Sequence, residues 1–295
     1  MSTLAQRLKA GRFTVTTELT PPKGIDLAEL YAKARALAPH VAAFNLTESP
    51  RARMAIAPVA VARLLLERGI EPIVQMTARD RNRIAIQAEL LGAAALGVEN
   101  FVFMAGDPPG KGDHPEAKPV FDLNASGMLQ AARALSLGRD LAGNELRGAP
   151  RLFAGATANP GAVDFEAEVA NTRRKIDAGA SFLQTQAVYE PEALERFLRA
   201  VRPEGVAVLA GLIPLKSARM ALWLNSNVPG IRVPEALIAR MAAAQGAEEE
   251  LRTGLEIASA GVRAARNLCA GVHLMALGWE AHIPAIIEQA GMEQC

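Results

Sequence analysis

The sequence has little that would direct it to nucleic acid. Its 32 basic and 31 acidic side chains leave a formal charge of only +1, whereas nucleic-acid-binding domains usually carry a basic excess. Aromatic residues make up 4% of the chain, so stacking platforms for single-stranded nucleic acid are not expected. We therefore expect no nucleic-acid partner.

Long apolar segments and cysteines are also scarce. The amino terminus lacks the apolar core of a signal peptide, and no segment has about 18 uninterrupted apolar residues. The only cysteines, Cys269 and Cys295, exclude a paired-cysteine zinc cluster and make a disulfide framework implausible at this length. The four histidines show no metal-binding spacing. These absences predict a cytoplasmic protein without a membrane span or a catalytic metal.

Sequence motifs for nucleotide phosphates and for hydrolysis are missing as well. The chain has no Walker-type loop, no Gly-x-Ser-x-Gly elbow, and no Gly-x-Gly-x-x-Gly between a predicted strand and a helix. A Rossmann nicotinamide site is therefore unsupported.

Short apolar runs alternate along the chain with longer stretches of helical periodicity, which is typical of repeated βα units. The predicted strands are Phe13–Leu19, Val41–Thr47, Pro72–Thr77, Phe101–Ala105, Leu152–Thr157, Phe182–Gln186, Val206–Leu212 and Gly271–Leu277. The predicted helices are Leu27–Leu37, Ala55–Arg68, Arg83–Leu96, Ser126–Leu137, Asp164–Ala178, Pro191–Val201 and Ala247–Leu268. Eight such units favour one (β/α)8 barrel of the TIM type over residues 1–295, rather than an open doubly wound sheet.

Functional residues of such a barrel gather at the carboxyl ends of the strands, where the βα loops meet. The polar residues at predicted strand ends are Glu18, Asn45, Thr47, Gln75, Thr77, Asp107, Thr157, Asn159, Gln184 and Gln186. We expect them to converge on one rim, although any single Thr or Asn there can equally be a turn former or a helix cap.

Two acids of this rim are candidates for acid–base chemistry. Glu18 lies in an otherwise apolar strand, and burial there would raise its pKa towards the range of a general acid. The alternative is a structural ion pair with a rim base such as Lys23. Asp107 follows the fourth strand in a Gly-Asp-Pro-Pro-Gly turn, where Asp is an ordinary residue. Two acids in one site can still divide their roles, one donating a proton and the other remaining an anion.

Basic groups occur in two segments. The first segment is Arg79–Arg83, in which Asp80 can cap the following helix while the arginines are solvated. However, the dipole disfavours cations at the start of a helix. The three arginines therefore also fit a site for a phosphate or carboxylate ligand. Helical spacing puts Asn171, Arg174 and Lys175 near one face, where they could hold a pyrophosphate or form a solvated surface. His273, inside an apolar strand, is expected to be a hydrogen-bonded core residue.

Several stretches, taken in order, resemble the 5,10-methylenetetrahydrofolate reductases, a family of flavin-dependent barrel enzymes. The matching stretches are Thr17–Gly24, Gln75–Arg83, Ala105–Asp107, Asn171–Gly179, Thr185–Gln186 and Gly211–Pro214. Arg79–Arg83 and Gly271–His273 look most similar to the bacterial branch that includes reductases of acetogens. The resemblance implies a ping-pong reaction in which NADH or NADPH reduces a flavin, FAD by expectation, which then passes hydride to methylenetetrahydrofolate.

The resemblance also implies roles for individual residues. Glu18 would protonate the departing folate nitrogen, Asp107 would stabilise the developing cation near flavin and pterin, and Gln186 would hydrogen-bond the folate. The positions that match flavin contacts are Thr47, Gln75, Gly106, Asp107, Asn159, Glu168, Asn171, Arg174 and Lys175.

The chain departs from the family pattern at four positions. Ala105 stands where an Arg is usual, Gly155 where a Tyr stacks on the flavin, Met220 where a Gln meets the folate, and Trp279 where an Arg follows the last strand. FMN or no flavin is therefore possible. Two alternatives for the activity remain: a flavin-free folate reductase and a pterin-binding methyltransferase. For the assembly, the chain can be a homo-oligomer or a partner subunit of a redox complex. Glu18 favours the reductase, because ring opening requires an internal acid.

Overall fold

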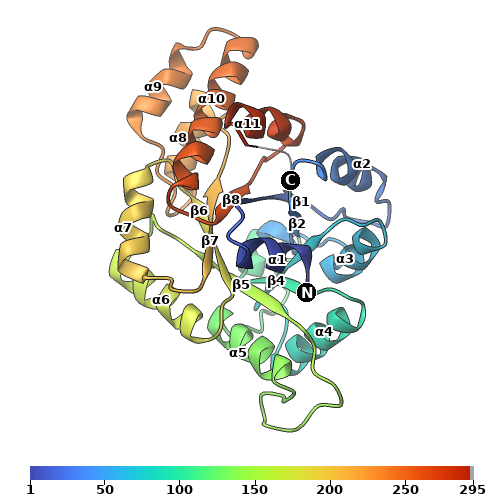
Figure 1. Ribbon diagram of the computed structural model, residues 1–295. Coiled ribbons are helices and arrows are strands. Elements are labelled where there is room, and N and C mark those ends of the chain that lie inside the picture. Colours follow the sequence, from blue (N-terminus) through green and yellow to red (C-terminus); the bar gives the residue numbers. More distant parts are fainter. Residues whose placement is uncertain (293–295) are drawn as a thin grey trace.

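Eight parallel strands close into one barrel in the computed structural model, which describes residues 1–292 (Figure 1). Each strand pairs with the next in chain order, and β8 pairs with β1. The strands are β1 (Thr14–Leu19), β2 (Ala43–Leu46), β3 (Pro72–Thr77), β4 (Asn100–Met104), β5 (Phe153–Ala158), β6 (Phe182–Ala187), β7 (Ala207–Leu212) and β8 (Gly271–Leu274). The predicted (β/α)8 barrel is thus confirmed, although β4 ends before Ala105 and β8 ends at Leu274, before Leu277. Cys295 lies outside the described residues.

Helices surround the barrel, and every predicted helix is present. The helices are α1 (Thr3–Lys9), α2 (Ala28–Leu37), α3 (Pro58–Leu66), α4 (Arg83–Ala95), α5 (Ala125–Ser136), α6 (Phe165–Asp177), α7 (Pro191–Val201), α8 (Ala218–Asn227), α9 (Glu235–Ala243), α10 (Ala247–Arg266) and α11 (Ile283–Gln289), with short 3₁₀ turns η1 (Pro50–Ala52), η2 (Pro109–Lys111) and η3 (Glu280–His282). The sequence did not predict α1, α8, α9 or α11. α4 is capped by the side chain of Asn82, so the predicted cap at Asp80 is wrong.

The helices α8 and α9 stand out from the barrel beside one end of α10, at the top of Figure 1. An apolar cluster holds them, and it includes Leu224 of α8, Met241 of α9 and Ile257 of α10. Between β7 and β8 the barrel therefore carries three helices instead of one.

The barrel interior changes from apolar to polar along the strands. At the amino-terminal end, Leu4 and Leu8 of α1 pack into the barrel, and α1 lies across that opening (Figure 1). The strand residues packed with them are Ala43, Ile73, Val102, Phe182 and Leu209. Because side chains alternate along a strand, the interior positions two residues further on from three of these are Asn45, Gln75 and Gln184. The polar layer therefore begins inside the barrel and leads to the rim.

One glycine of the barrel wall is required by close packing. Gly155 lies in the middle of β5, in register with Val102 and Phe182, and a Cβ atom there would lie 2.6 Å from the Phe182 carbonyl oxygen. The neighbouring strand backbone cannot move away without disturbing the ladder. Gly155 therefore lies in the wall and not at the rim, and this chain has no room there for a flavin-stacking Tyr.

Two carboxylates fix the segment between β4 and α5 to neighbouring loops through hydrogen bonds. Asp113 accepts from Lys23 Nζ at 2.7 Å and from the Met54 amide at 3.0 Å. Asp122 accepts from the Arg83 guanidinium at 2.9 and 3.0 Å and from its amide at 2.8 Å. The hydrogen bond from Lys23 lowers the pKa of Asp113 to about 2, and that from Arg83 does the same to the pKa of Asp122. These bonds connect the loops after β1, β2 and β4 with the start of α4.

We predict that Gly155→Ala destabilises the protein by about 1–3 kcal/mol, because the added methyl group overpacks the β5–β6 contact. Gly92→Ala is the matched control. Gly92 is exposed within α4 and has open space at its Cβ position, so alanine should stabilise the helix by about 0.5–1 kcal/mol. Chemical denaturation of both variants checks this, and equal effects of the two substitutions would contradict it.

Acid should weaken the folded state through Asp113 and Asp122. Their folded-state pKa of about 2 lies below the ordinary 3.8, so each group contributes stability above pH 3.8 that is lost as the pH falls towards 2. The double variant Asp113→Asn/Asp122→Asn should start less stable near neutral pH and lose less on acidification. Thermal melting of both proteins across this range measures the difference, and parallel curves would contradict the prediction.

Candidate active site

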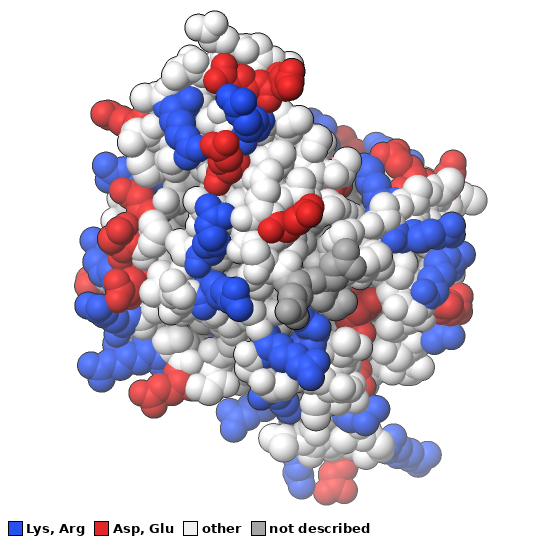
Figure 2. Space-filling view, turned by 45° about the horizontal axis from the view of Figure 1, so that its top comes forward, with Lys and Arg blue, Asp and Glu red and all other residues white. Residues whose placement is uncertain are grey.

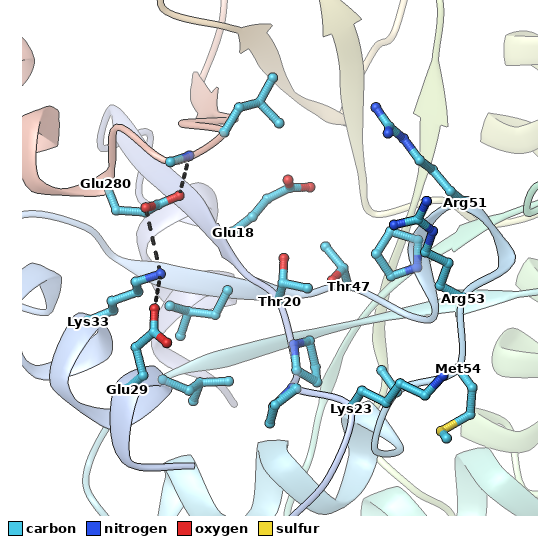
Figure 3. Close-up of a pocket in the computed structure, with 18 of the residues that line it drawn as sticks. Glu18, Thr20, Lys23, Glu29, Lys33, Thr47, Arg51, Arg53, Met54 and Glu280 are labelled. Atoms are coloured by element: carbon cyan, nitrogen blue, oxygen red, sulfur yellow. Dashed lines mark hydrogen bonds and ion pairs between the residues drawn. The ribbon is translucent and has the colours of Figure 1, made fainter. Parts of the chain in front are cut away.

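A cavity of about 1030 Å³ opens at the carboxyl ends of β1, β2 and β8. Its wall includes Glu18 of β1, Thr47 after β2, and charged residues of the surrounding loops (Figure 3). The charged residues labelled there include Lys23, Lys33 of α2, Arg51, Arg53 and Glu280. This is the end of the barrel at which catalytic residues are expected, and the volume suits an organic ligand of the size of a coenzyme.

Glu18 is held at the edge of this cavity by two side chains. Gln75 Nε2 of β3 donates to Glu18 Oε1 at 3.1 Å, and His273 Nε2 of β8 lies 3.4 Å from the same oxygen. The other ring nitrogen of His273 is 2.9 Å from Thr16 Oγ1. His273 is thus the hydrogen-bonded core histidine that was predicted, but its contact with Glu18 was not foreseen. With a proton on Nε2, the imidazole donates to the carboxylate.

The electrostatics of Glu18 differ from the prediction. Burial does raise the pKa of Glu18, but the hydrogen bond and charge of His273, together with the hydrogen bond from Gln75, outweigh it, so the pKa lies below its ordinary value. The predicted raised pKa is therefore wrong for the protein without ligand. An ion pair between Glu18 and Lys23 is also wrong, because Lys23 bonds Asp113.

Glu48 is a buried acid that sequence analysis missed. Its Oε2 accepts from the Thr77 amide at 2.6 Å and from Thr77 Oγ1 at 2.8 Å, while its Oε1 pairs with Arg81 Nη2 at 2.7 Å. Glu48 thereby joins the loop after β2 to the end of β3. Its place directly after Thr47 in the rim segment was the available signal.

The arginines of Arg79–Arg83 are neutralised within the protein. Buried Arg79 forms a two-pronged pair with Asp80 at 2.6 and 2.7 Å and also bonds the carbonyl of Asp107. Arg81 pairs with Glu48, and Arg83 with Asp122. The interpretation of this segment as solvated arginines is wrong for Arg79 and Arg81, whereas Arg83 is exposed. Apart from Arg81 Nη1, which is buried without a partner among the described residues, these pairs occupy the groups that an external anion would need.

The predicted cofactor residues of β5 and α6 do lie together. Glu168 accepts from the Asn159 amide at 2.9 Å and from Asn171 Nδ2 at 2.9 Å. Lys175 is buried, donates to the Thr157 carbonyl at 2.7 Å and lies 4.0 Å from Glu168. Desolvation lowers the pKa of Lys175 despite the nearby carboxylate. These groups largely satisfy one another and fasten α6 to the end of β5.

Arg174 does not share that environment. It is exposed, and within residues 1–292 its guanidinium makes no hydrogen bond or ion pair. The predicted common face of Asn171, Arg174 and Lys175 is thus split, because Lys175 turns inward and Arg174 meets solvent.

The remaining predicted residues lie on the same rim but do not line the cavity beside Glu18. Asp107 is exposed, with its carboxylate 3.7 Å from Lys111 Nζ. Gly106 has φ +87°, and a Cβ there would meet Thr77 at 2.9 Å, so a glycine is needed where this turn packs on β3. Gln186 lies at an irregularity of β6, and its Oε1 accepts from the Ala187 amide.

Two buried oxygens at the rim have no hydrogen-bond partner among the described residues. They are Thr47 Oγ1, at the cavity, and Asn159 Oδ1, after β5. Such atoms are costly to leave unsatisfied and are suited to a ligand or bound water. Thr47, which lines the cavity, is therefore the residue best placed to hold a cofactor, whereas the Asn159 amide packs against Gly230.

Of the other departures from the family pattern, Met220 and Trp279 are explained by packing, and nothing in the structure explains Ala105. Ala105 is exposed directly after β4. Met220 of α8 packs with the α8–α9 cluster, and Trp279 packs against Gly254 and edge-on to His282. Trp279 thus serves packing rather than charge recognition.

Over the described residues, no cluster of three His, Cys, Asp or Glu side chains is arranged to hold a metal ion. Nor is any helix within residues 1–292 long and apolar enough to cross a membrane. On the face shown in Figure 2, basic and acidic groups are both spread among uncharged residues.

Comparison with solved structures gives similar folds at low sequence identity. An uncharacterized protein from Clostridium thermocellum, which binds two copies of 5-methyl-5,6,7,8-tetrahydrofolic acid, has a TM-score of 0.59 and 15% identity, with 97% of each chain covered. The EDTA monooxygenase EmoA from Chelativorans sp. BNC1 has a TM-score of 0.58 and 11% identity, over 95% of this chain and 98% of that one. These likenesses concern the fold.

Comparison of sequences identifies the family. A probable methylenetetrahydrofolate reductase (NADPH) of Caenorhabditis elegans is 27% identical over 155 residues, which are 50% of this chain and 21% of that protein. Methylenetetrahydrofolate reductase 2 of Schizosaccharomyces pombe is 23% identical over 241 residues, 76% of this chain and 36% of that protein. The chain thus spans about a fifth to just over a third of these relatives. The family model for methylenetetrahydrofolate reductase matches residues 3–291, and the chain therefore belongs to the methylenetetrahydrofolate reductase family.

Proposed function

We propose that this protein reduces 5,10-methylenetetrahydrofolate to 5-methyltetrahydrofolate, with NADH or NADPH as the electron donor and a flavin, FAD or FMN, as the carrier. Membership of the family supports the reaction class. The observation that carries the proposal is the position of Glu18, a carboxylate at the edge of the large cavity with His273 and Gln75 bonded to it.

The reaction requires an acid at this position. The methylene group of the substrate bridges two nitrogens and accepts hydride poorly until the five-membered ring opens. Protonation of the departing nitrogen produces an electrophilic iminium, and Glu18 is the proton donor in our proposal. The neutral form of Glu18 becomes favourable when bound folate excludes water, because desolvation penalises the carboxylate.

His273 can supply the proton that Glu18 lacks in the ligand-free protein. Its Nε2 lies 3.4 Å from Glu18 Oε1, and Thr16 orients the ring through Nδ1. With a proton on Nε2, the imidazole donates to the Glu18 carboxylate. In our proposal, the same contact is the path by which a proton reaches Glu18 before ring opening.

A bound flavin would accept electrons from the nicotinamide and deliver them as hydride. Thr47, Gln75, Gly106, Asn159 and Arg174 would hold it, with the network of Glu168, Asn171 and Lys175 shaping the end of β5. The negative charge of Asp107 would stabilise the iminium cation. Gln186 uses its Oε1 internally, which leaves its Nε2 to donate to the folate.

A flavin-free folate reductase is the second candidate. The observation that favours it is the mutual bonding of Glu168, Asn171 and Lys175, which occupies groups expected to contact the flavin. Uptake of FAD or FMN by the purified protein separates the two candidates, and Glu18 has the same role in both.

We predict that Glu18→Gln slows reduction of methylenetetrahydrofolate by about 10²–10⁴-fold, the usual contribution of a general acid. Reduction of bound flavin by NADH or NADPH should remain largely intact, because that step does not open the folate ring. Stopped-flow absorbance measures the two half-reactions separately. Equal loss of both would rule out the proton-donor role.

His273→Gln should alter the pH dependence of the folate half-reaction. Removal of the imidazole takes away the main influence that lowers the pKa of Glu18, so the pKa that reports Glu18 in the pH profile should move upward, with a slower maximal rate. His282→Gln, at a histidine packed on Trp279 outside the cavity wall, is the control. An unchanged profile in His273→Gln would contradict the proposed pair.

A further inference from the structure

The charged residues of the cavity wall are paired on one side. Lys33 lies 2.8 Å from Glu29 and 3.9 Å from Glu280, and these three stand together opposite Arg51 and Arg53 (Figure 3). Lys23 is paired with Asp113 at 2.7 Å. Both lysines are therefore already matched by protein carboxylates.

Arg51 and Arg53, by contrast, are unmatched. Both line the cavity and are exposed, and within residues 1–292 neither guanidinium makes a hydrogen bond or ion pair. Glu18 already has its partners, and the remaining acid of the wall, Asp26, accepts from the Ala28 amide at the start of α2. Among the described residues, no carboxylate of the cavity wall pairs with either arginine, although the wall also contains Glu29, Asp113 and Glu280.

The loop that presents these arginines is held in an unusual conformation. Ser49, Arg51 and Ala52 have φ of 42°, 57° and 55°, a region that residues other than glycine seldom adopt. Gly112 packs so closely on this loop that a Cβ there would lie 1.9 Å from the Ala52 carbonyl oxygen, and Asp113 bonds the Met54 amide. The neighbouring loop therefore fixes the backbone that carries both arginines. Such preorganisation lowers the entropy cost of binding.

We propose that Arg51 and Arg53 bind the carboxylates of the glutamate tail of the folate. The inference rests on the proposed function, which places the reacting pterin end at Glu18. Figure 3 shows the Glu18 carboxylate and the two arginines facing the same space from different sides. A folate with its pterin at Glu18 can extend its tail across the cavity towards them. Two guanidinium groups match two carboxylates in charge and in hydrogen-bonding geometry.

The test compares ligands and proteins in pairs. The protein variant is Arg51→Gln/Arg53→Gln, which removes both charges and keeps most of the side-chain length. The ligands are 5-methyltetrahydrofolate and its diamide, in which both glutamate carboxylates are carboxamides. Isothermal calorimetry with each combination gives the coupling between the arginines and the carboxylates.

We expect the wild-type protein to bind the acid about 10- to 100-fold more tightly than the diamide, in line with charge-assisted hydrogen bonds at an exposed site. The variant should bind both ligands with the weaker affinity. Arg51→Lys/Arg53→Lys should recover part of the preference. Arg266→Gln, at an exposed arginine that ends α10 at the opposite end of the barrel, should behave as wild type.

Three results would overturn the inference. The variant could keep the wild-type preference for the acid, or it could lose affinity for acid and diamide equally. It could also lose affinity for NADH or NADPH alone, which would assign the arginines to nucleotide phosphates. Failure of the wild-type protein to bind any folate would instead refute the proposed function itself. Thermal melting of each variant separates loss of binding from loss of folding.

Discussion

The site depends on one carboxylate that stays charged at the edge of a barrel interior. Glu18 is a quarter exposed, and burial alone would favour its neutral form. The hydrogen bonds from Gln75 on β3 and from His273 on β8 reverse that preference. His273 is available only because the barrel closes, with β8 in register beside β1. Closure of the sheet is therefore also what assembles the acid–base pair.

Side-chain hydrogen bonds between strands also satisfy other groups in the polar layer of the barrel. Asn45 and Gln184 exchange two side-chain hydrogen bonds of 2.7 and 3.1 Å across the interior, so neither amide is left unsatisfied. Glu48 fixes the loop after β2 to the end of β3. Rigid loops result on one side of the cavity, where Arg51 and Arg53 are displayed. Because most polar groups of the rim are satisfied within the protein, the rim is rigid enough to position a few unpaired side chains, such as Arg51 and Arg53, for a ligand.

Much of this could be predicted from the sequence, and the exceptions have physical reasons. Parallel strands are buried on both faces, so their apolar runs were readily identified, and the single carboxylate in the first run located Glu18. The pKa of Glu18 could not be predicted, because its direction depends on His273, which comes from the far end of the chain. Glu48 resembled an ordinary loop residue until its partners Thr77 and Arg81 were known. Gly155 was matched to a flavin-stacking Tyr because the sequence alone did not show how deep in the wall β5 places it.

The measurement that tests the account most directly is a single turnover without oxygen. Wild-type protein loaded with FAD or FMN is reduced by NADH or NADPH and then mixed with 5,10-methylenetetrahydrofolate, while flavin absorbance and folate products are followed. The account predicts that the flavin is reoxidised and that 5-methyltetrahydrofolate forms in an amount equal to the flavin. A reduced flavin that persists in the presence of the folate, with no 5-methyltetrahydrofolate formed, would contradict it.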